Sequence, residues 1–398
     1  MRFHLLGLSH TRTTKEFSCC AFTQKVRLLS KMLTDLGHTV YHYGTEGSDP
    51  VCTENVTVLS DSCWRAVHGD RNWKRDGFNV SLDTAAWRQF NARCKEEITK
   101  RVQDRDFILC NFGHAHQTIS QFFPRCITVE PGIGYPITFA KYRVFESYAW
   151  MHYHYGKEGK ECSPEWYDAV IPNSLDLADF PFESKKENYM IFVGRLSNTN
   201  KGFGIADDVC RRLGIKLYLA GQGGPIPGMQ GEYLGVLSIE DRAKWVSKAR
   251  AAFVPTYYIE PFGTTNIEAQ AYGTPVICTD FGAFTETVIH GLTGFRCRTF
   301  EQFMWAAQHI DEIDPNNCRK HAEKYSIYNA GRMYEEYFAN LQRLFADNQG
   351  WYYMPVQRSK HWLLMNGVFN GTEQGNAANK FFQFWRDKSP FRRKSGSV

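Results

Sequence analysis

Two glutamates, Glu260 and Glu268, bracket the segment Glu260-Pro-Phe-Gly-Thr-Thr-Asn-Ile-Glu268. The apolar run at 251–255 predicts a strand before this segment, and the residues after Gly263 predict a helix. A glycine-containing loop between a strand and a helix directs backbone N–H groups toward an anionic ligand. Glu268 would then lie one helical turn inside, within reach of a ribose hydroxyl. Glu260 would stay on the loop, close to whatever group the phosphates carry. The combination predicts a site for a sugar nucleotide.

Basic residues and glycines follow another predicted strand in the second half of the chain. Gly194 and Arg195 end the apolar run at 189–193, and Lys201 follows a few residues later. An arginine and a lysine at this position could neutralise a diphosphate, while glycine lets the backbone approach it. The alternative is an ordinary strand end that carries solvated basic residues.

A repeated β–α–β pattern predicts the elements that must position these residues. The predicted strands are at 3–8, 39–43, 107–111, 126–130, 169–171, 189–193, 216–220, 251–255 and 275–278, and the predicted helices at 22–36, 205–213, 239–248, 266–272 and 330–347. This alternation predicts parallel sheets covered by helices. We therefore expect an α/β fold of two Rossmann-like domains facing across a cleft, with ligands beyond the carboxyl ends of the strands.

We expect three parts along the chain. Residues 1–178 form an acceptor-side domain, residues 179–345 a nucleotide-sugar domain, and residues 346–398 an aromatic and basic extension that packs back on the first domain. The extension carries Lys388, Arg392, Arg393 and Lys394 close together, which usually indicates solvated charge and less often a nucleic-acid contact.

Composition indicates a folded protein that acts in the cytoplasm. The chain has 398 residues, 43% hydrophobic and 22% charged, which suits two domains. Its 12 cysteines include no CxxC pair, as is typical of reduced thiols. No apolar run is long enough to span a membrane. A net charge of +5 permits a polyanionic partner without requiring one.

Motifs between residues 194 and 294 carry a family resemblance. Gly194-Arg195, Lys201-Gly202, Glu260-Pro-Phe-Gly, Glu268-Ala, Gly273-Thr-Pro-Val and Gly291-x2-Gly294 occur in the order found in GT-B retaining glycosyltransferases of family 4, whose donor-binding half this region resembles. The resemblance implies transfer of a hexose from a nucleoside-diphosphate sugar, with UDP-glucose as the default donor. That donor is a co-substrate, so no cofactor and no metal are expected. The residues implied in donor binding are Gly194, Arg195, Lys201, Gly263, Thr264, Thr265 and Glu268. Glu260 is implied as a catalytic residue that lies against the transferred sugar.

The first half of the chain resembles the same family less closely. Asn111-Phe-Gly-His114-Ala-His116 follows a predicted strand, where the family often places a histidine beside the reacting sugar. Either His114 or His116 is therefore a catalytic candidate, and a structural hydrogen bond is the alternative. The family's glycine-rich loop is replaced by the segment 7–14, in which His10 and Thr11 are candidates for binding the acceptor.

Three further segments, 4–11, 17–25 and 145–152, resemble a group of bacteriophage glycosyltransferases, which would place the chain in the cytoplasm of an infected host. In the third segment, Tyr148 and Trp150 could bind the acceptor by stacking on a sugar or a base, or they could belong to the core. Aromatic residues beside Lys141 and Arg143 would suit a nucleic-acid strand.

The favoured acceptor is therefore 5-hydroxymethylcytosine or a similarly modified base in phage DNA, which must be flipped out of the duplex. The alternatives are a glycan, a lipid or a virion protein. A sugar-nucleotide epimerase of the same fold and a degenerate GT-B protein that binds nucleotide or nucleic acid without catalysis are also considered. The motif Asp104-Arg-Asp106 matches a metal-binding pattern, but it precedes a strand and is interpreted as solvated surface.

Overall fold

The computed structural model describes residues 1–69 and 71–347, with side chains through Leu344. The predicted extension at 346–398, including its basic cluster, lies outside the described residues except for 346–347. Among the residues described, no helix combines the length and apolar character that crossing a membrane requires.

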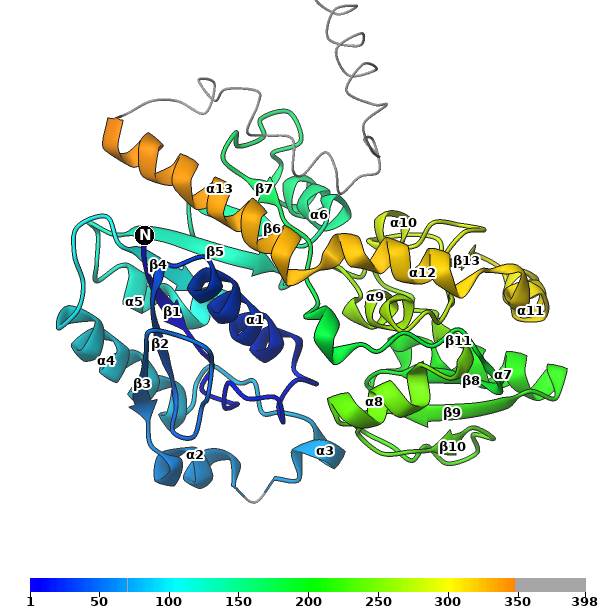
Figure 1. Ribbon diagram of the computed structural model, residues 1–398. Coiled ribbons are helices and arrows are strands. Elements are labelled where there is room, and N and C mark those ends of the chain that lie inside the picture. The colour runs from blue at the N-terminus through cyan, green and yellow to red at the C-terminus, as the bar shows by residue number, and fades with distance from the viewer. Residues whose placement is uncertain (70, 348–398) are drawn as a thin grey trace, which may run out of the picture. The chain divides into compact units, whose positions relative to one another are not determined.

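The first half of the described chain forms a seven-stranded parallel sheet in the order β3-β2-β1-β4-β5-β6-β7 (Figure 1). Its strands are β1 (Arg2–Leu6), β2 (Thr39–Thr45), β3 (Glu54–Leu59), β4 (Phe107–Cys110), β5 (Ile127–Ile133), β6 (Tyr142–Phe145) and β7 (Ala169–Val170). Its helices are α1 (Ala21–Asp35), α2 (Asp61–His68), α3 (Trp73–Asp76), α4 (Ala85–Thr99), α5 (Gln117–Ser120) and α6 (Tyr148–Glu158). The strand order reverses between β1 and β4, and ligands of open α/β sheets bind beyond the strand ends at such a point.

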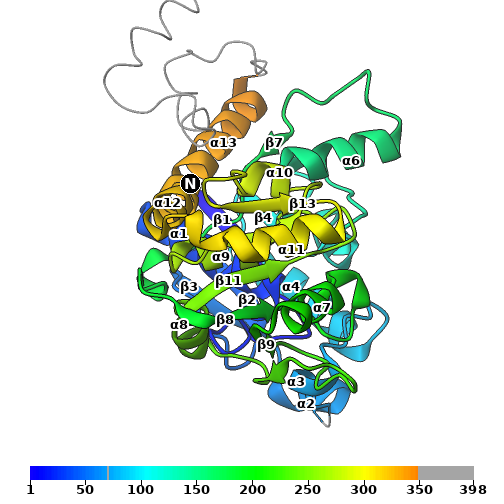
Figure 2. The same ribbon diagram turned by 90° about the vertical axis from the view of Figure 1, so that its right-hand side faces the viewer.

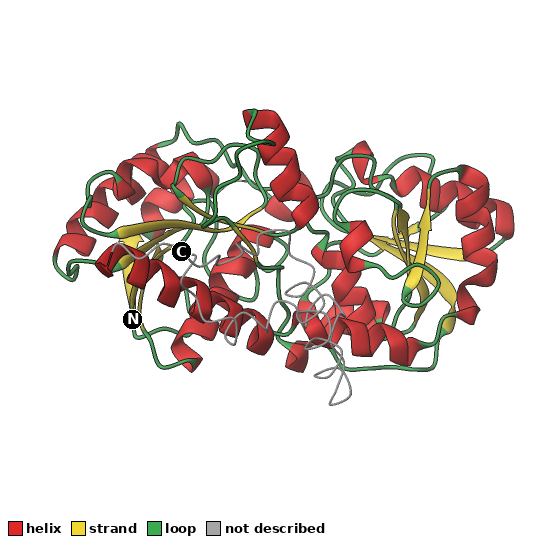
Figure 3. Cartoon of the chain, turned by 90° about the horizontal axis from the view of Figure 1, so that it is seen from above, coloured by secondary structure: helices red, strands yellow, loops and turns green. Residues whose placement is uncertain are grey.

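The second half forms a six-stranded parallel sheet in the order β10-β9-β8-β11-β12-β13, so its reversal lies between β8 and β11. Its strands are β8 (Glu187–Val193), β9 (Lys216–Ala220), β10 (Glu232–Tyr233), β11 (Ala249–Val254), β12 (Val276–Thr279) and β13 (Gly294–Cys297). Its helices are α7 (Phe203–Leu213), α8 (Ile239–Val246), α9 (Thr264–Ala271), α10 (Phe284–Thr287), α11 (Phe300–His309) and α12 (Pro315–Ala322). Figure 3 shows each sheet between helices.

Each sheet buries its own apolar core. In the second half, apolar side chains of α7 and α11 pack on one face of the sheet, and Phe192 and Phe253 lie among them. Helices α7 and α11 lie side by side there (Figure 2). The two parallel sheets and their helices confirm the prediction of two Rossmann-like domains.

The chain crosses between the halves twice, and the two crossings are hydrogen-bonded to each other. The Leu175 N–H donates to the Tyr325 carbonyl (2.8 Å), and the Ile327 N–H donates to the Leu175 carbonyl (2.9 Å). After the second crossing, α13 (Ile327–Asp347) packs against α1 and β5 (Figure 1). Its Phe338 ring lies 4.8 Å from the ring of Phe3. The last described helix therefore covers the first sheet, although the predicted boundary assigned it to the second domain.

Several elements were absent from the sequence-based prediction, among them β3, β6, β13 and α6. Strand β6 is a buried strand with a charged residue, Arg143, in its middle, and this charge interrupts the apolar run that would have marked it. Helix α6 has aromatic side chains on most of its faces, so it shows no clear helical periodicity.

Candidate active site

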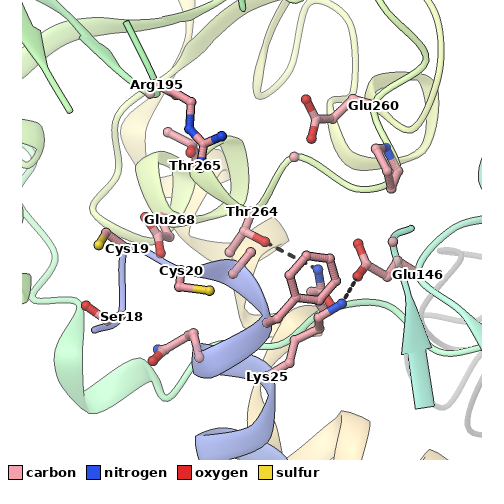
Figure 4. Close-up of a pocket in the computed structure, with 18 of the residues that line it drawn as sticks. Ser18, Cys19, Cys20, Lys25, Glu146, Arg195, Glu260, Thr264, Thr265 and Glu268 are labelled. Carbon is pink, nitrogen blue, oxygen red and sulfur yellow. Dashed lines mark hydrogen bonds and ion pairs between the residues drawn. The ribbon is translucent and has the colours of Figure 1, made fainter. Parts of the chain in front are cut away.

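A cavity of about 630 Å³ is lined by residues that follow the carboxyl ends of strands in both sheets. One wall comes from the second half and contains the predicted catalytic residue Glu260. It also contains every residue predicted for donor binding: Gly194, Arg195, Lys201, Gly263, Thr264, Thr265 and Glu268. Figure 4 shows Arg195 and Glu260 on one side of this cavity and Lys25 on the opposite side, with Thr264 between them. The structure thus brings together the whole predicted donor set.

The amino end of α9 is built around Gly263. This residue has a φ of 75°, and a side chain on it would come within 2.7 Å of the Phe284 ring. Glycine is therefore the residue that this turn tolerates. Helix α9 begins at Thr264 and has no side-chain cap, which leaves N–H groups of the first turn for another acceptor. Thr264 and Thr265 line the cavity, so an anion bound there would meet these groups.

Lys201 and Glu260 form an ion pair in the cavity wall. The Nζ of Lys201 lies 2.6 Å from Oε2 of Glu260 and 5.0 Å from the centre of the Tyr258 ring. Burial disfavours the charge on Lys201, but the attraction of Glu260 outweighs it and raises the pKa of the ammonium. An ammonium group has three N–H donors, and Glu260 occupies one of them. The Tyr258 side chain also lies within hydrogen-bonding range of this ammonium, which leaves a third donor available to a phosphate oxygen.

Glu268 is held by Arg242, a residue that the sequence-based prediction missed. Nη1 of Arg242 lies 3.0 Å and 2.8 Å from the two carboxylate oxygens, and Nη2 donates to the Ser18 hydroxyl at 3.0 Å. Burial disfavours the charge of Arg242, but the attraction of Glu268 outweighs it and raises the pKa of the guanidinium. One signal in the sequence could have identified Arg242. It shares a face of α8 with buried Ile239 and Val246, where a charged residue needs a buried partner.

The opposite wall comes from the first half and combines rings with one ion pair. Its members include His10, Phe22, Lys25, Asn111, Phe112, Glu146 and Trp150. Lys25 binds the Glu146 carboxylate and donates to the carbonyl of Gly132 at 2.5 Å. Three buried atoms of this wall, His10 Nδ1, Asn111 Oδ1 and Trp150 Nε1, have no hydrogen-bond partner within the described residues. Buried polar atoms normally have partners, so these three are exceptions in the described structure.

The two candidate histidines that follow β4, His114 and His116, are not among the described residues that line the cavity. His116 is fully buried between the rings of Trp87 and Phe90, and its Nε2 lies 3.0 Å from the carbonyl oxygen of Gly7. Burial lowers the pKa of His116 to about 3. His114 is exposed, with its Nδ1 2.7 Å from the Gln117 side chain. The histidine that does line the cavity is His10.

Of the four residues predicted to bind the acceptor, two line the cavity and two do not. His10 and Trp150 line the cavity. Thr11 is buried and its hydroxyl is 2.6 Å from that of Thr23, while the Tyr148 amide donates to the Glu286 carboxylate at 3.0 Å. Within the described residues, neither Thr11 nor Tyr148 contributes to the cavity lining.

The amino end of α6 joins the two halves next to the site. The Tyr148 and Ala149 amides donate to Glu286 from the second half, at 3.0 and 2.8 Å. The Ser147 hydroxyl donates to the carbonyl of Pro261, the residue after Glu260, at 2.6 Å. The loop that carries Glu260 is therefore supported by the first half of the chain.

Arg143, one of the two basic residues that would suit a nucleic-acid strand, is instead buried in β6. Its guanidinium lies 2.6 Å from Asp168 and 2.9 Å from Glu158. Burial disfavours its charge, but the hydrogen bond with Asp168 and the attraction of this carboxylate outweigh the effect and raise the pKa of the guanidinium. The positive charge of Arg143 is thus neutralised by carboxylates of the first half.

Substituting methionine for Arg143 should therefore destabilise the fold. The substitution leaves Asp168 as a buried, unpaired carboxylate, and losing one partner of a buried pair costs about 3–5 kcal/mol. Urea denaturation would measure this loss in the free energy of unfolding. Lys141→Met is the matched control, because Lys141 is an exposed basic residue of the same segment and its replacement should change the unfolding midpoint little.

The Asp104-Arg-Asp106 motif precedes β4, at the edge of the sheet opposite the cavity. Asp106 is buried, with its Oδ2 3.1 Å from Nε2 of His4, and Asp104 faces Arg125. Over the described residues, no group of three or more His, Cys, Asp or Glu side chains is arranged to hold a metal ion.

Residues 228–330 match the family model "Glycosyl transferases group 1". The chain is 31% identical over 148 residues to glycogen synthase of Mycobacterium tuberculosis, a match that covers 32% of this chain and 35% of that protein. It is 36% identical over 95 residues to D-inositol 3-phosphate glycosyltransferase of a Nocardioides species, covering 24% of this chain and 20% of that protein. The chain thus spans about a third or less of the length of these relatives.

Solved structures match over most of the chain. AviGT4, a glycosyltransferase involved in avilamycin A biosynthesis, superposes with a TM-score of 0.61 and 18% identity, covering 87% of this chain and 98% of that one. HepE of Anabaena in complex with UDP-glucose superposes with a TM-score of 0.59 and 14% identity, covering 85% and 99%. At this level of identity the similarity establishes the fold, and it confirms the predicted GT-B architecture.

Proposed function

We propose that this chain is a retaining glycosyltransferase that moves a hexose from a nucleoside-diphosphate sugar, UDP-glucose by default, to an acceptor hydroxyl. The observation that carries the proposal is the convergence of Arg195, Lys201, Glu260, Glu268 and the amino end of α9 on one cavity. The match of residues 228–330 to group 1 glycosyl transferases and the UDP-glucose bound by HepE support it.

Breaking the bond to the sugar leaves new negative charge on the diphosphate. Arg195, Lys201 and the N–H groups at the start of α9 would stabilise that charge as it develops. Glu268 would accept hydrogen bonds from the ribose. Glu260, fixed by Lys201, would face the sugar and support positive charge at its anomeric carbon. A diphosphate oxygen would take the acceptor's proton on the same face, so neither His114 nor His116 is required as a base.

The acceptor hydroxyl would enter along the wall formed by the first half. A hydroxymethylated base of phage DNA, as the sequence predicts, could lie against the side chain of Trp150. A neutral glycan is the second candidate. Two sets of ion pairs support a neutral glycan over DNA. Glu146 already neutralises Lys25. Arg143 is already bound by Asp168 and Glu158. These contacts remove positive charges that a polynucleotide backbone would need.

We also propose that the protein acts in the cytoplasm of a phage-infected host. All twelve cysteines lie in the described residues as free thiols, which suits a reducing compartment. The phage-like segments 4–11, 17–25 and 145–152 support a phage origin.

Incubation of the protein with UDP- and GDP-sugars and with candidate acceptors tests the proposal. Unmodified DNA, hydroxymethylated DNA and oligosaccharides would each be offered, and products would be identified by mass spectrometry. We expect release of nucleoside diphosphate that depends on the acceptor, with a hexose added to one acceptor class. A donor sugar altered without any acceptor would indicate an epimerase. Nucleotide binding without turnover on any acceptor would indicate a binding protein.

A further inference from the structure

Arg242 contacts both halves of the chain at the cavity. Its Nη1 binds both carboxylate oxygens of Glu268, and its Nη2 donates to the hydroxyl of Ser18, which lies 224 residues away in the sequence. Ser18, Arg242 and Glu268 all line the cavity. In the described structure, this guanidinium therefore joins the predicted ribose ligand to the opposite wall.

The contact fixes how Glu268 is presented. A carboxylate has about four lone-pair positions, and Arg242 occupies one on each oxygen. The other positions remain for the hydroxyls of a ribose. Arginine is planar and can bond in two directions at once, so its geometry sets the angle of the carboxylate in a way that a lysine would not. Only 11% of each side chain, Arg242 and Glu268, is exposed, so loss of the arginine would leave an unpaired charge.

The second arm of Arg242 reaches the loop between β1 and α1. Ser18 precedes Cys19 and Cys20 in this loop, and Sγ of Cys20 lies 3.7 Å from Nε2 of His10. His10 belongs to the wall along which the acceptor would enter. A continuous set of contacts therefore runs from Glu268 through Arg242 and the loop to the acceptor side.

We propose that Arg242 is a positioning residue that couples nucleotide binding at Glu268 to the docking of the 17–20 loop. The inference rests on the proposed function, because it assumes that a nucleotide occupies the cavity. A ribose bound to Glu268 immobilises the carboxylate and with it the guanidinium, which then holds Ser18 at less entropic cost. Because coupling between two contacts is reciprocal, loss of the Ser18 contact should also weaken nucleotide binding. Ser18 would exert this effect only through Arg242.

A double-mutant cycle on nucleotide affinity tests this coupling. UDP and GDP would be titrated calorimetrically into the full chain and its Ser18→Ala, Arg242→Gln and Glu268→Gln variants, alone and in pairs. Arg242→Gln and Glu268→Gln should each weaken binding about 10- to 100-fold, the range of one charged hydrogen bond. The Arg242→Gln, Glu268→Gln double variant should bind nucleotide no more weakly than Glu268→Gln alone. Ser18→Ala should weaken nucleotide binding about 2- to 10-fold when it is the only substitution. In a chain that already carries Arg242→Gln, it should have no further effect.

Lys244→Gln is the matched control, because Lys244 is an exposed basic residue of the same helix. It should bind UDP and GDP as the parent does. Thermal unfolding without nucleotide would establish that each variant is folded. If Arg242→Gln does not fold, Arg242→Lys takes its place in the cycle, because it keeps the charge but loses the two-directional geometry.

Two results would overturn the inference: effects of Arg242→Gln and Glu268→Gln that multiply, or a Ser18→Ala effect of the same size with and without Arg242. A parent chain that binds neither UDP nor GDP while staying folded would instead contradict the proposed function. The failure of the coupling and the failure of the function are thereby distinguished.

Discussion

Replacing Lys201 with glutamine is expected to lower kcat by about 10²- to 10³-fold, the range found when one preorganised electrostatic contact to a transition state is removed. The substitution removes a positive charge from the leaving diphosphate, and it also leaves Glu260 without its partner at 2.6 Å. Steady-state turnover of the preferred donor, followed by nucleoside-diphosphate release, would measure the loss.

Lys185→Gln serves as the control for Lys201→Gln, because Lys185 is an exposed basic residue of the second half that lies outside the cavity lining in the described chain. Its turnover should match that of the parent. Unchanged kcat in a folded Lys201→Gln variant would remove Lys201 from the proposed chemistry.

Replacing Glu260 with glutamine is expected to separate turnover from nucleotide binding. Glu260 would face the sugar rather than the nucleotide, so its charge matters most when positive charge develops at the anomeric carbon. We expect kcat to fall about 10²-fold or more. The affinity for UDP or GDP should stay within about threefold, because that interaction is made mainly in the transition state.

Glu240→Gln, which changes an exposed carboxylate on α8, should leave both kcat and nucleotide affinity unchanged. A Glu260→Gln variant that loses nucleotide affinity and turnover in equal measure would assign Glu260 to nucleotide binding instead of to the reacting sugar.

The wall from the second half was predictable from the sequence because its residues form two short motifs that each follow the end of a strand. Gly194 and Arg195 directly follow β8, and the segment from Glu260 to Glu268 spans the end of the β11–α9 loop and the first turns of α9. Parallel strands bring such loops to one edge of a sheet, so local spacing is enough to predict that they meet.

The opposite wall depends on contacts between residues far apart in the sequence. Lys25 meets Glu146 across 121 residues, and Arg242 meets Ser18 across 224. A local sequence pattern cannot predict pairs that are so far apart in the chain. The predicted histidines show the same limit: the chain after β4 turns into a 3₁₀ helix at Gly113–His116, which directs His116 into the core among Trp87 and Phe90.

The path of α13 has a consequence for how the protein is made. The first sheet leaves the ribosome early, but Phe338, which packs on Phe3 and Phe107, is synthesised more than 300 residues after Phe3. Domains usually fold as units in the order of synthesis. Here α13 can cover the hydrophobic surface of the first half only after the second half has been translated. A nascent chain stalled before Ile327 would therefore expose this surface and become a substrate for chaperones.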